Sequence, residues 1–331
     1  MTNHVTVAGH GRRVSKLGFV FALGIIGYVL VVNLLYLRFL GNPKDFFTSG
    51  NLVWILVFAG FIGSCALYRL YRLSGDGANV ARWLGGRLVV LEPGEENLRV
   101  YRNVATEVAI AAGIPMPRLF VLESDRSINA FAAGTLQEGT AICVSAGALE
   151  KLDRHELQGV VAHEMAHLRH RDVRVSRLLA SAIFGLACIA GVGVLLAMLG
   201  GKAAGSGSKE GAGGGLVLTL AGLVVLLVGA AGWFAAAVLD AATSREMELR
   251  ADADAVRMLS DSSGLVGALV KIGVEADEFP VEARAWFKGR NPMYFNASVK
   301  RYWFDTHPPL FDRIQALDPA SAAELRTRMG G

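Results

Sequence analysis

Residues 161–167 read Val-Ala-His-Glu-Met-Ala-His, a His-Glu-x-x-His pattern. Four residues make just over one helical turn, so His163 and His167 project from one face of a helix, about 6 Å apart, and can share one metal ion. Zinc binds imidazole nitrogen, and two histidines leave room for a third protein ligand and a water. Glu164 can reach that water without binding the metal, so the pattern predicts a catalytic zinc centre holding one ion.

The residues around this pattern predict that it lies inside a buried helix. Asp153 is followed three residues later by Glu156, which is the spacing of a capping box at a helix start. Leu157 and Val160 then make the flank of the pattern apolar. Ionisable groups in such a flank are costly to bury without a metal or charged partners. A histidine-rich helix face with no metal is the alternative reading.

A third ligand is expected from the segment Ser244–Asp252. Glu248 and Asp252 are four residues apart and therefore share a helix face. Glu248 can complete a His-His-Glu zinc site, and Asp252 can accept a hydrogen bond from the distal nitrogen of a zinc-bound histidine. An acidic pair is more often a solvated surface, but two predicted membrane spans separate the two motifs, which returns the chain to the same side. His170 lies too far along the helix axis to be a good ligand.

The composition predicts a membrane protein. The chain is 53% hydrophobic and 19% charged, with a mean hydropathy of +0.40, whereas a soluble domain is about 45–50% apolar and about 25% charged. A helix of about 20 apolar residues crosses a bilayer. The candidate spans lie at about residues 17–37, 52–67, 178–199 and 216–239, and a buried core helix is the alternative for any one of them.

The first span is expected to be an uncleaved anchor, because no small-residue cleavage site follows it. The third and fourth spans are joined by a glycine-rich stretch, residues 200–215, which predicts a flexible linker. Lysine and arginine concentrate on the side that holds the N-terminus, residues 70–176 and the C-terminal region, which predicts that this side is cytoplasmic.

Charge and cysteine content exclude other classes. The net charge is only +4 and the basic residues are spread along the chain, so no nucleic-acid surface is expected. The three cysteines form no Cys-x-x-Cys pair, which argues against a disulfide framework and against a cysteine-built zinc site.

Between the second and third spans, the pattern predicts a helix over residues 95–112 and short strands at 119–122, 128–132 and 141–144. After the fourth span, helices are expected over 243–259 and 311–317. The predicted fold class is therefore α+β, mainly α, with a small β-sheet and an active-site helix, combined with about four transmembrane helices.

Together these motifs resemble a known family. The segment 163–167, the Ser-Arg…Glu…Ala-Asp pattern of 244–252 and Thr-His-Pro-Pro at 306–309 are similar to the HtpX-type membrane metallopeptidases, gluzincins related to the CAAX prenyl endopeptidases. The resemblance covers about residues 95–317. The family often has Asn-Gly before the aspartate that matches Asp172, whereas this chain has His170-Arg171, so the turn after the active-site helix is where the chain departs from the pattern.

The resemblance implies a zinc-dependent endopeptidase of the inner membrane that cleaves membrane or misfolded proteins, with its active site facing the cytoplasm. The expected partners are the lipid bilayer and polypeptide substrates. The expected domains are a membrane anchor over residues 1–73 and a metallopeptidase domain over 74–331, interrupted by a transmembrane hairpin at about 178–239.

In this interpretation Glu164 is the general base, and His307 resembles a C-terminal histidine that hydrogen-bonds the developing oxyanion. An edge strand is expected to bind extended substrate through its main chain. The expected substrate-binding residues are Asn129, Ala130, Phe131, Ala132 and Arg313. For His307 and Arg313, a turn residue and a surface charge are equally good readings.

Two other classes stay open. A membrane protein that binds zinc without cleaving peptides predicts that Glu164→Gln keeps full function. A transporter predicts ionisable residues within the spans, where only the polar Asn33 is found.

Overall fold

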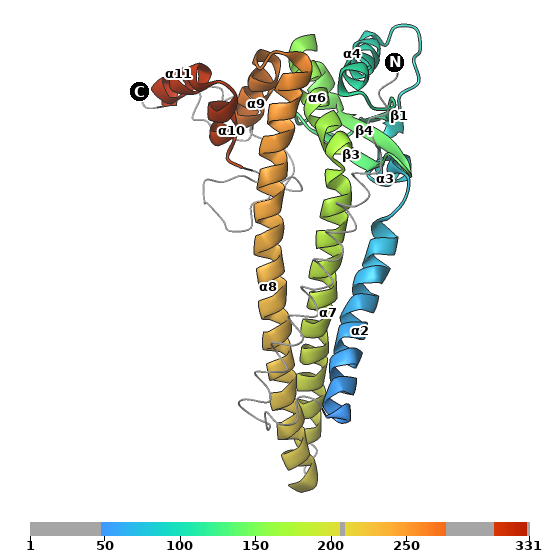
Figure 1. The fold of residues 1–331 in the computed structure, drawn as a ribbon, viewed down its shortest axis with the longest axis vertical. Helices are drawn as coiled ribbons and strands as arrows, with labels where there is room; N and C mark the ends of the chain where they lie inside the picture. Colours follow the sequence, from blue (N-terminus) through green and yellow to red (C-terminus); the bar gives the residue numbers. More distant parts are fainter. Residues whose placement is uncertain (1–47, 206–208, 276–307, 330–331) are drawn as a thin grey trace. The chain divides into compact units, whose positions relative to one another are not determined.

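The computed structural model describes residues 48–205, 209–275 and 308–329 (Figure 1). The predicted first span and His307 lie outside these residues. The elements in chain order are α2 (Ser49–Leu73), α3 (Gly77–Trp83), β1 (Arg87–Leu88), α4 (Glu96–Ala112), β2 (Arg118–Leu122), β3 (Ala130–Thr135), β4 (Gly139–Ser145), α5 (Ala146–Lys151), α6 (Arg154–His170), α7 (Asp172–Ala204), α8 (Lys209–Leu259), α9 (Ser263–Glu275), α10 (Leu310–Leu317) and α11 (Pro319–Met329).

The chain divides into two compact units. One contains α2 together with residues 177–237, and the other contains residues 74–176 and the described residues from 238 onward. The predicted fold class is confirmed, since long apolar helices accompany a mainly helical domain with one small mixed sheet.

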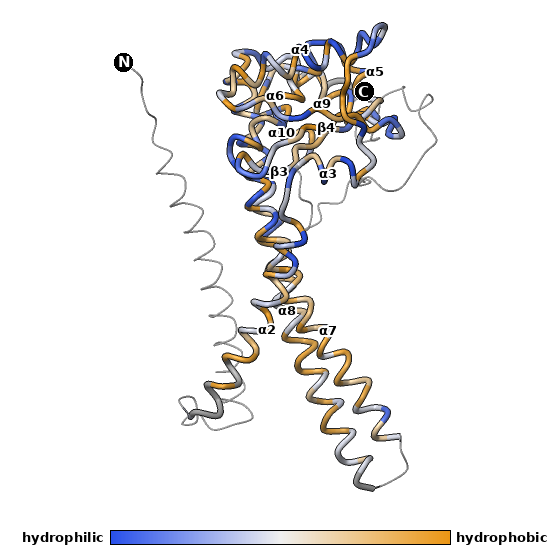
Figure 2. Tube along the Cα trace, turned by 90° about the vertical axis from the view of Figure 1, so that its right-hand side faces the viewer, coloured by the Kyte–Doolittle hydropathy of each residue, from blue (hydrophilic) through white to orange (hydrophobic). Residues whose placement is uncertain are grey.

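Within the described ranges, three helices are long and apolar enough to cross a membrane: α2 over Leu56–Leu73, α7 over Asp172–Ala204 and α8 over Gly211–Leu259. Apolar residues dominate α7 and α8 along most of their length (Figure 2). Only 11%, 28% and 17% of the residues in the three apolar windows are buried, so most of these side chains face outward. Outward-facing apolar side chains suit lipid and argue against buried core helices.

Glycines allow α7 and α8 to pack closely. A Cβ atom on Gly193 would lie 2.2 Å from the backbone nitrogen of Leu226, and one on Gly222 would lie 2.3 Å from that of Ala197. Small residues at such contacts let membrane helices approach each other. The predicted linker over 200–215 is wrong in its extent, because α7 continues to Ala204 and α8 begins at Lys209. The predicted fourth span and the helix after it are likewise one continuous helix, α8.

The sheet has the strand order β1-β2-β4-β3, with β2 and β4 parallel and the other pairs antiparallel. Its side chains alternate between two faces. Ile142 and Val144 of β4 belong to the main core with residues of α4 and α6, whereas Cys143 packs with Ala78 and Ala81 of α3 on the other face. The predicted strands correspond to β2, β3 and β4, while β1 has only two residues and was not predicted.

The sheet core brings α6 against β3 and β4. On α4, Tyr101 is fully buried and its hydroxyl donates a hydrogen bond to the carbonyl oxygen of Ile142 at 3.1 Å. Met165 of α6 is also fully buried. Helix α6, which carries the predicted metal site, therefore packs through apolar side chains against both α4 and the sheet.

Candidate metal centre

Helix α6 begins with the predicted capping box. The Asp153 carboxylate accepts a hydrogen bond from the backbone nitrogen of Glu156 at 2.9 Å, and the Glu156 carboxylate accepts one from the backbone nitrogen of Asp153 at 2.8 Å. This arrangement satisfies two backbone donors that no helical carbonyl can reach. It starts α6 at Arg154, so the whole pattern 163–167 lies in one regular helix.

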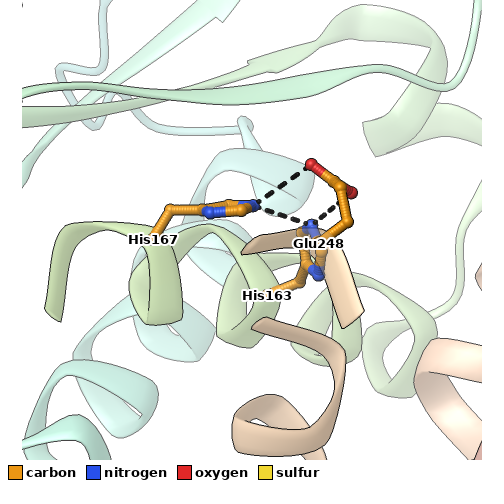
Figure 3. A group of neighbouring side chains, drawn as sticks. All are labelled: His163, His167 and Glu248. Carbon is orange, nitrogen blue, oxygen red and sulfur yellow. Dashed lines mark hydrogen bonds and ion pairs between the residues drawn. The ribbon is translucent and has the colours of Figure 1, made fainter. Parts of the chain in front are cut away.

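His163, His167 and Glu248 converge on one point (Figure 3). The two histidine Nε2 atoms are 3.1 Å apart, and the rings meet edge to face. One Glu248 oxygen lies 3.4 Å from Nε2 of His163, and the other lies 3.5 Å from Nε2 of His167. Zinc–nitrogen bonds of about 2.0–2.1 Å in a tetrahedral site require a nitrogen–nitrogen separation of about 3.3 Å. The three side chains can therefore hold a metal ion.

Behind His163 lies a buried charged pair. The Nδ1 atom of His163 is 2.8 Å from an oxygen of Asp252, which is the contact that the sequence predicted. Arg313 donates two hydrogen bonds of 2.7 Å to the two oxygens of Asp252, and its guanidinium also lies 3.3 Å from Glu248. Arg313 is 7% exposed and Asp252 is 1% exposed. The bidentate pair keeps the carboxylate ionised and aimed at the imidazole.

Behind His167 lies a second carboxylate, which the sequence reasoning did not assign. The Nδ1 atom of His167 is 2.8 Å from an oxygen of Asp172, and Arg250 donates a hydrogen bond to the other oxygen. Asp172 reaches the ring because Arg171 adopts the left-handed conformation, with φ 62° and ψ 32°, and ends α6. The only signal in the sequence was the departure from the family pattern at these positions. His170 instead contacts Asp254 and is not one of the three converging residues.

The carboxylates make the centre strongly attractive to cations. Burial alone lowers the pKa of His163, but hydrogen bonds with Asp252 and Glu248 raise it above its ordinary value. Burial likewise lowers the pKa of His167, but Asp172, Glu248 and the Glu164 charge raise it to about 10. A site that binds protons this firmly favours positive charge, and a divalent ion can replace the protons.

Asp252 lies beyond the apolar part of α8. Burial raises its pKa, but the hydrogen bonds from Arg313 and His163 outweigh burial and lower the pKa to about 2. Asp252 therefore stays ionised across the physiological pH range and can accept a hydrogen bond from Nδ1–H of His163 throughout that range.

Glu164, the predicted general base, is buried beside His163 on α6, at 9% exposure.

The predicted substrate-binding residues lie in and before β3. The Asn129 side chain donates a hydrogen bond to Asp125 at 3.3 Å and so belongs to the turn before β3. Ala130, Phe131 and Ala132 pair with β4 through one edge of β3. As β3 is the last strand in the sheet order, its other edge has no partner strand within the described residues. The substrate-binding roles of residues 129–132 and of Arg313 stay predictions.

Comparisons with known proteins give one family. The family model for Peptidase family M48 matches residues 96–321. A protein described as "Protease HtpX homolog" from Thermoanaerobacter pseudethanolicus is 34% identical over 67% of this chain and 72% of its own length. Another with that description, from Ligilactobacillus salivarius, is 29% identical over 91% of this chain and 93% of its own length.

Among solved structures, the crystal structure of S. mikatae Ste24p is similar, with a TM-score of 0.46 and 19% identity. The match covers 95% of this chain and 67% of that chain.

Proposed function

Because this chain belongs to peptidase family M48 and is a membrane metallopeptidase, we propose that it is a zinc-dependent endopeptidase that cleaves membrane or misfolded proteins. The observation that carries the proposal is the convergence of His163, His167 and Glu248, from α6 and α8, within 4.8 Å of one another. Three protein ligands and one open position are the usual arrangement of a catalytic zinc site.

The donor set fits zinc rather than a harder ion. Two imidazoles and one carboxylate are typical zinc ligands, whereas magnesium and calcium prefer oxygen alone. Both Nδ1 atoms face carboxylates at 2.8 Å, so each Nε2 atom is available to a metal. When bound, zinc would polarise the substrate carbonyl and lower the pKa of a coordinated water from that of bulk water to about 7.

Glu164 is the proposed general base. Glu164 follows His163 directly on α6 and is buried. Its charge raises the pKa of His167, so the carboxylate lies close enough to act electrostatically on the proposed ligands. Its carboxylate accepts a proton from the attacking water and returns it to the leaving amine. His307 is proposed to hydrogen-bond the oxyanion that forms at the scissile carbonyl.

The free edge of β3 is the proposed substrate-binding strand. Ala130 and Ala132 turn their side chains toward the core that contains α6, and β3 contacts α6. An extended peptide added to this edge would be held by main-chain hydrogen bonds, so recognition would depend little on its side chains. Such binding suits unfolded segments of many sequences.

The proposed location is the inner membrane, with the active site in the cytoplasm. Arg69 and Arg72 lie at the end of α2, and Arg174 and Arg177 lie at the beginning of α7. Basic residues beside membrane spans favour the cytoplasmic side. We also retain a division into an anchor over residues 1–73 and a peptidase domain over 74–331, interrupted at about 178–239.

The test is cleavage of an unfolded model protein by the full chain purified in detergent micelles. Glu164→Gln is expected to lower kcat by about 10²–10⁴-fold while one zinc per chain remains bound. Glu107→Gln is the control, because Glu107 pairs with Arg154 on the exposed surface and should leave the activity unchanged. Full activity of Glu164→Gln with zinc bound would reject the mechanism, and unchanged activity after chelation would reject zinc dependence.

A further inference from the structure

Asp172 lies behind His167 because α6 ends between them. In an unbroken helix, residues five apart point about 140° away from each other. The left-handed conformation of Arg171 interrupts the helix, and Asp172 becomes the first residue of α7. Its carboxylate thereby turns back toward the ring and accepts a hydrogen bond from Nδ1 of His167 at 2.8 Å. Asp172 is 3% exposed, so this contact is shielded from water.

Arg250 holds this carboxylate from the opposite side. It donates to the Asp172 oxygen that does not face His167. Arg250 is two residues after Glu248 on α8, so one helix supplies both a metal ligand and the cation that supports a second ligand. The arrangement parallels Arg313, Asp252 and His163, although the Arg250 side chain is 47% exposed and that of Arg313 is 8% exposed.

We propose that Asp172 and Arg250 are a positioning pair that sets the metal affinity of the centre by fixing the tautomer and the orientation of His167. A hydrogen bond at Nδ1 keeps the lone pair on Nε2, directed at the metal. Arg250 holds the second oxygen of the carboxylate and prevents the group from rotating away. The inference rests on the proposed function, since it requires His163, His167 and Glu248 to be the ligands.

The chain contains a matched control. His170, Asp254 and Arg257 form the same kind of contact series, in which a buried aspartate joins an imidazole to an arginine. Asp254 is 5% exposed, close to the 3% of Asp172. His170 is not one of the three converging ligands. Asp254→Asn therefore removes an equivalent buried interaction without touching a ligand.

The experiment compares Asp172→Asn and Asp254→Asn in the full chain in detergent micelles. The zinc dissociation constant is measured by competition with a chromophoric chelator, and the geometry of the site by the visible spectrum of the cobalt-substituted protein. Asp172→Asn is expected to weaken zinc binding about 10–100-fold and to change the cobalt spectrum. Asp254→Asn is expected to remain within about twofold of wild type in affinity, with an unchanged spectrum.

Arg250→Gln gives a second, independent measurement, because its half-exposed side chain is not needed for core packing. We expect a loss in zinc affinity smaller than that of Asp172→Asn, and no further loss when the two substitutions are combined, since they act through one carboxylate. Circular dichroism of the metal-free protein shows whether Asp172→Asn folds. If it does not, the zinc affinity of Arg250→Gln tests the proposal instead.

The inference is overturned if Asp172→Asn keeps wild-type affinity, or if Asp254→Asn loses as much. It is also overturned if Arg250→Gln has no effect. The proposed function fails separately: in that case wild type binds no zinc at one ion per chain, or His163→Ala binds it as tightly as wild type does.

Discussion

His163 and His167 each present one nitrogen to the proposed metal and the other to a buried carboxylate. The carboxylates come from different helices, α8 and α7, and each is held by an arginine. Because a carboxylate raises the basicity of the imidazole that it contacts, both ligands are prepared for a cation before one binds. Each arginine therefore positions a carboxylate, and each carboxylate positions a histidine.

Glu248→Gln is expected to weaken zinc binding by at least about 100-fold, because it replaces an anionic ligand with a neutral amide. The matched control is Glu246→Gln, which removes an exposed carboxylate two residues earlier on α8. Zinc content after dialysis against a weak chelator measures both variants. Equal zinc retention in the two would contradict the assignment of Glu248 as a ligand.

Arg171→Gly is expected to stabilise the protein. A residue with a side chain in the left-handed conformation is strained by about 1 kcal/mol relative to glycine, and Arg171 has φ 62°. The temperature of unfolding should rise by about 1–3 °C with unchanged zinc affinity. Arg171→Val should lower it, because a β-branched residue is least tolerant of positive φ. If both variants shifted the temperature in the same direction, this explanation would be wrong.

At the scale of elements, close contacts between helices depend on glycine. Gly222 lies against the backbone of Ala197 in the hairpin of α7 and α8. In the other compact unit, a Cβ atom on Gly159 of α6 would lie 2.5 Å from the backbone nitrogen of Leu265 in α9. Because backbone cannot move aside as a side chain can, any larger residue at these positions must separate the helices.

Gly222→Val is therefore expected to loosen the hairpin and lower the temperature of unfolding in micelles. Gly214→Val is the control on the same helix, because nothing lies within 4 Å of a Cβ atom at Gly214. Loosening can be measured as increased protease cleavage between α7 and α8. Equal susceptibility of the two variants would show that close packing at Gly222 does not stabilise the hairpin.

At the scale of the whole molecule, the proposed ligands come from both sides of the membrane hairpin in the sequence. His163 and His167 precede α7, and Glu248 follows the apolar part of α8. A single ion bound by these three residues would tie together two segments that are distant along the chain. Metal binding to the folded state alone stabilises that state in proportion to the logarithm of the free metal concentration.

Zinc removal is thus expected to destabilise the compact unit that contains α6 and the end of α8. With free zinc at about 100 times its dissociation constant, the stabilisation is about 2.7 kcal/mol. The shift between zinc-loaded and chelated protein in a thermal unfolding scan measures it. Glu164→Gln should retain the full shift, and Glu248→Gln should lose it. A wild-type protein that unfolds at one temperature with and without zinc would contradict the prediction.

Local sequence patterns by themselves determined the three long apolar helices of the described residues, the start of α6, and the placement of His163 and His167 on one helix face. These features follow from composition and from contacts within about one helical turn, which the chain carries in its own periodicity. The pairing of Asp252 with a histidine was also predictable, because Glu248 and Asp252 share a helix.

Only the tertiary structure decided that Asp172 contacts His167, that Arg250 supports Asp172, and that Arg313 pairs with Asp252. The contact between Asp172 and His167 depends on the backbone conformation of one residue, Arg171, which no periodicity specifies. The other two contacts join side chains that are far apart in the chain. The sequence does not distinguish an arginine that pairs with a buried carboxylate from an arginine that is exposed to solvent. Which of them is buried depends on how the helices pack, and packing is a property of the folded chain as a whole.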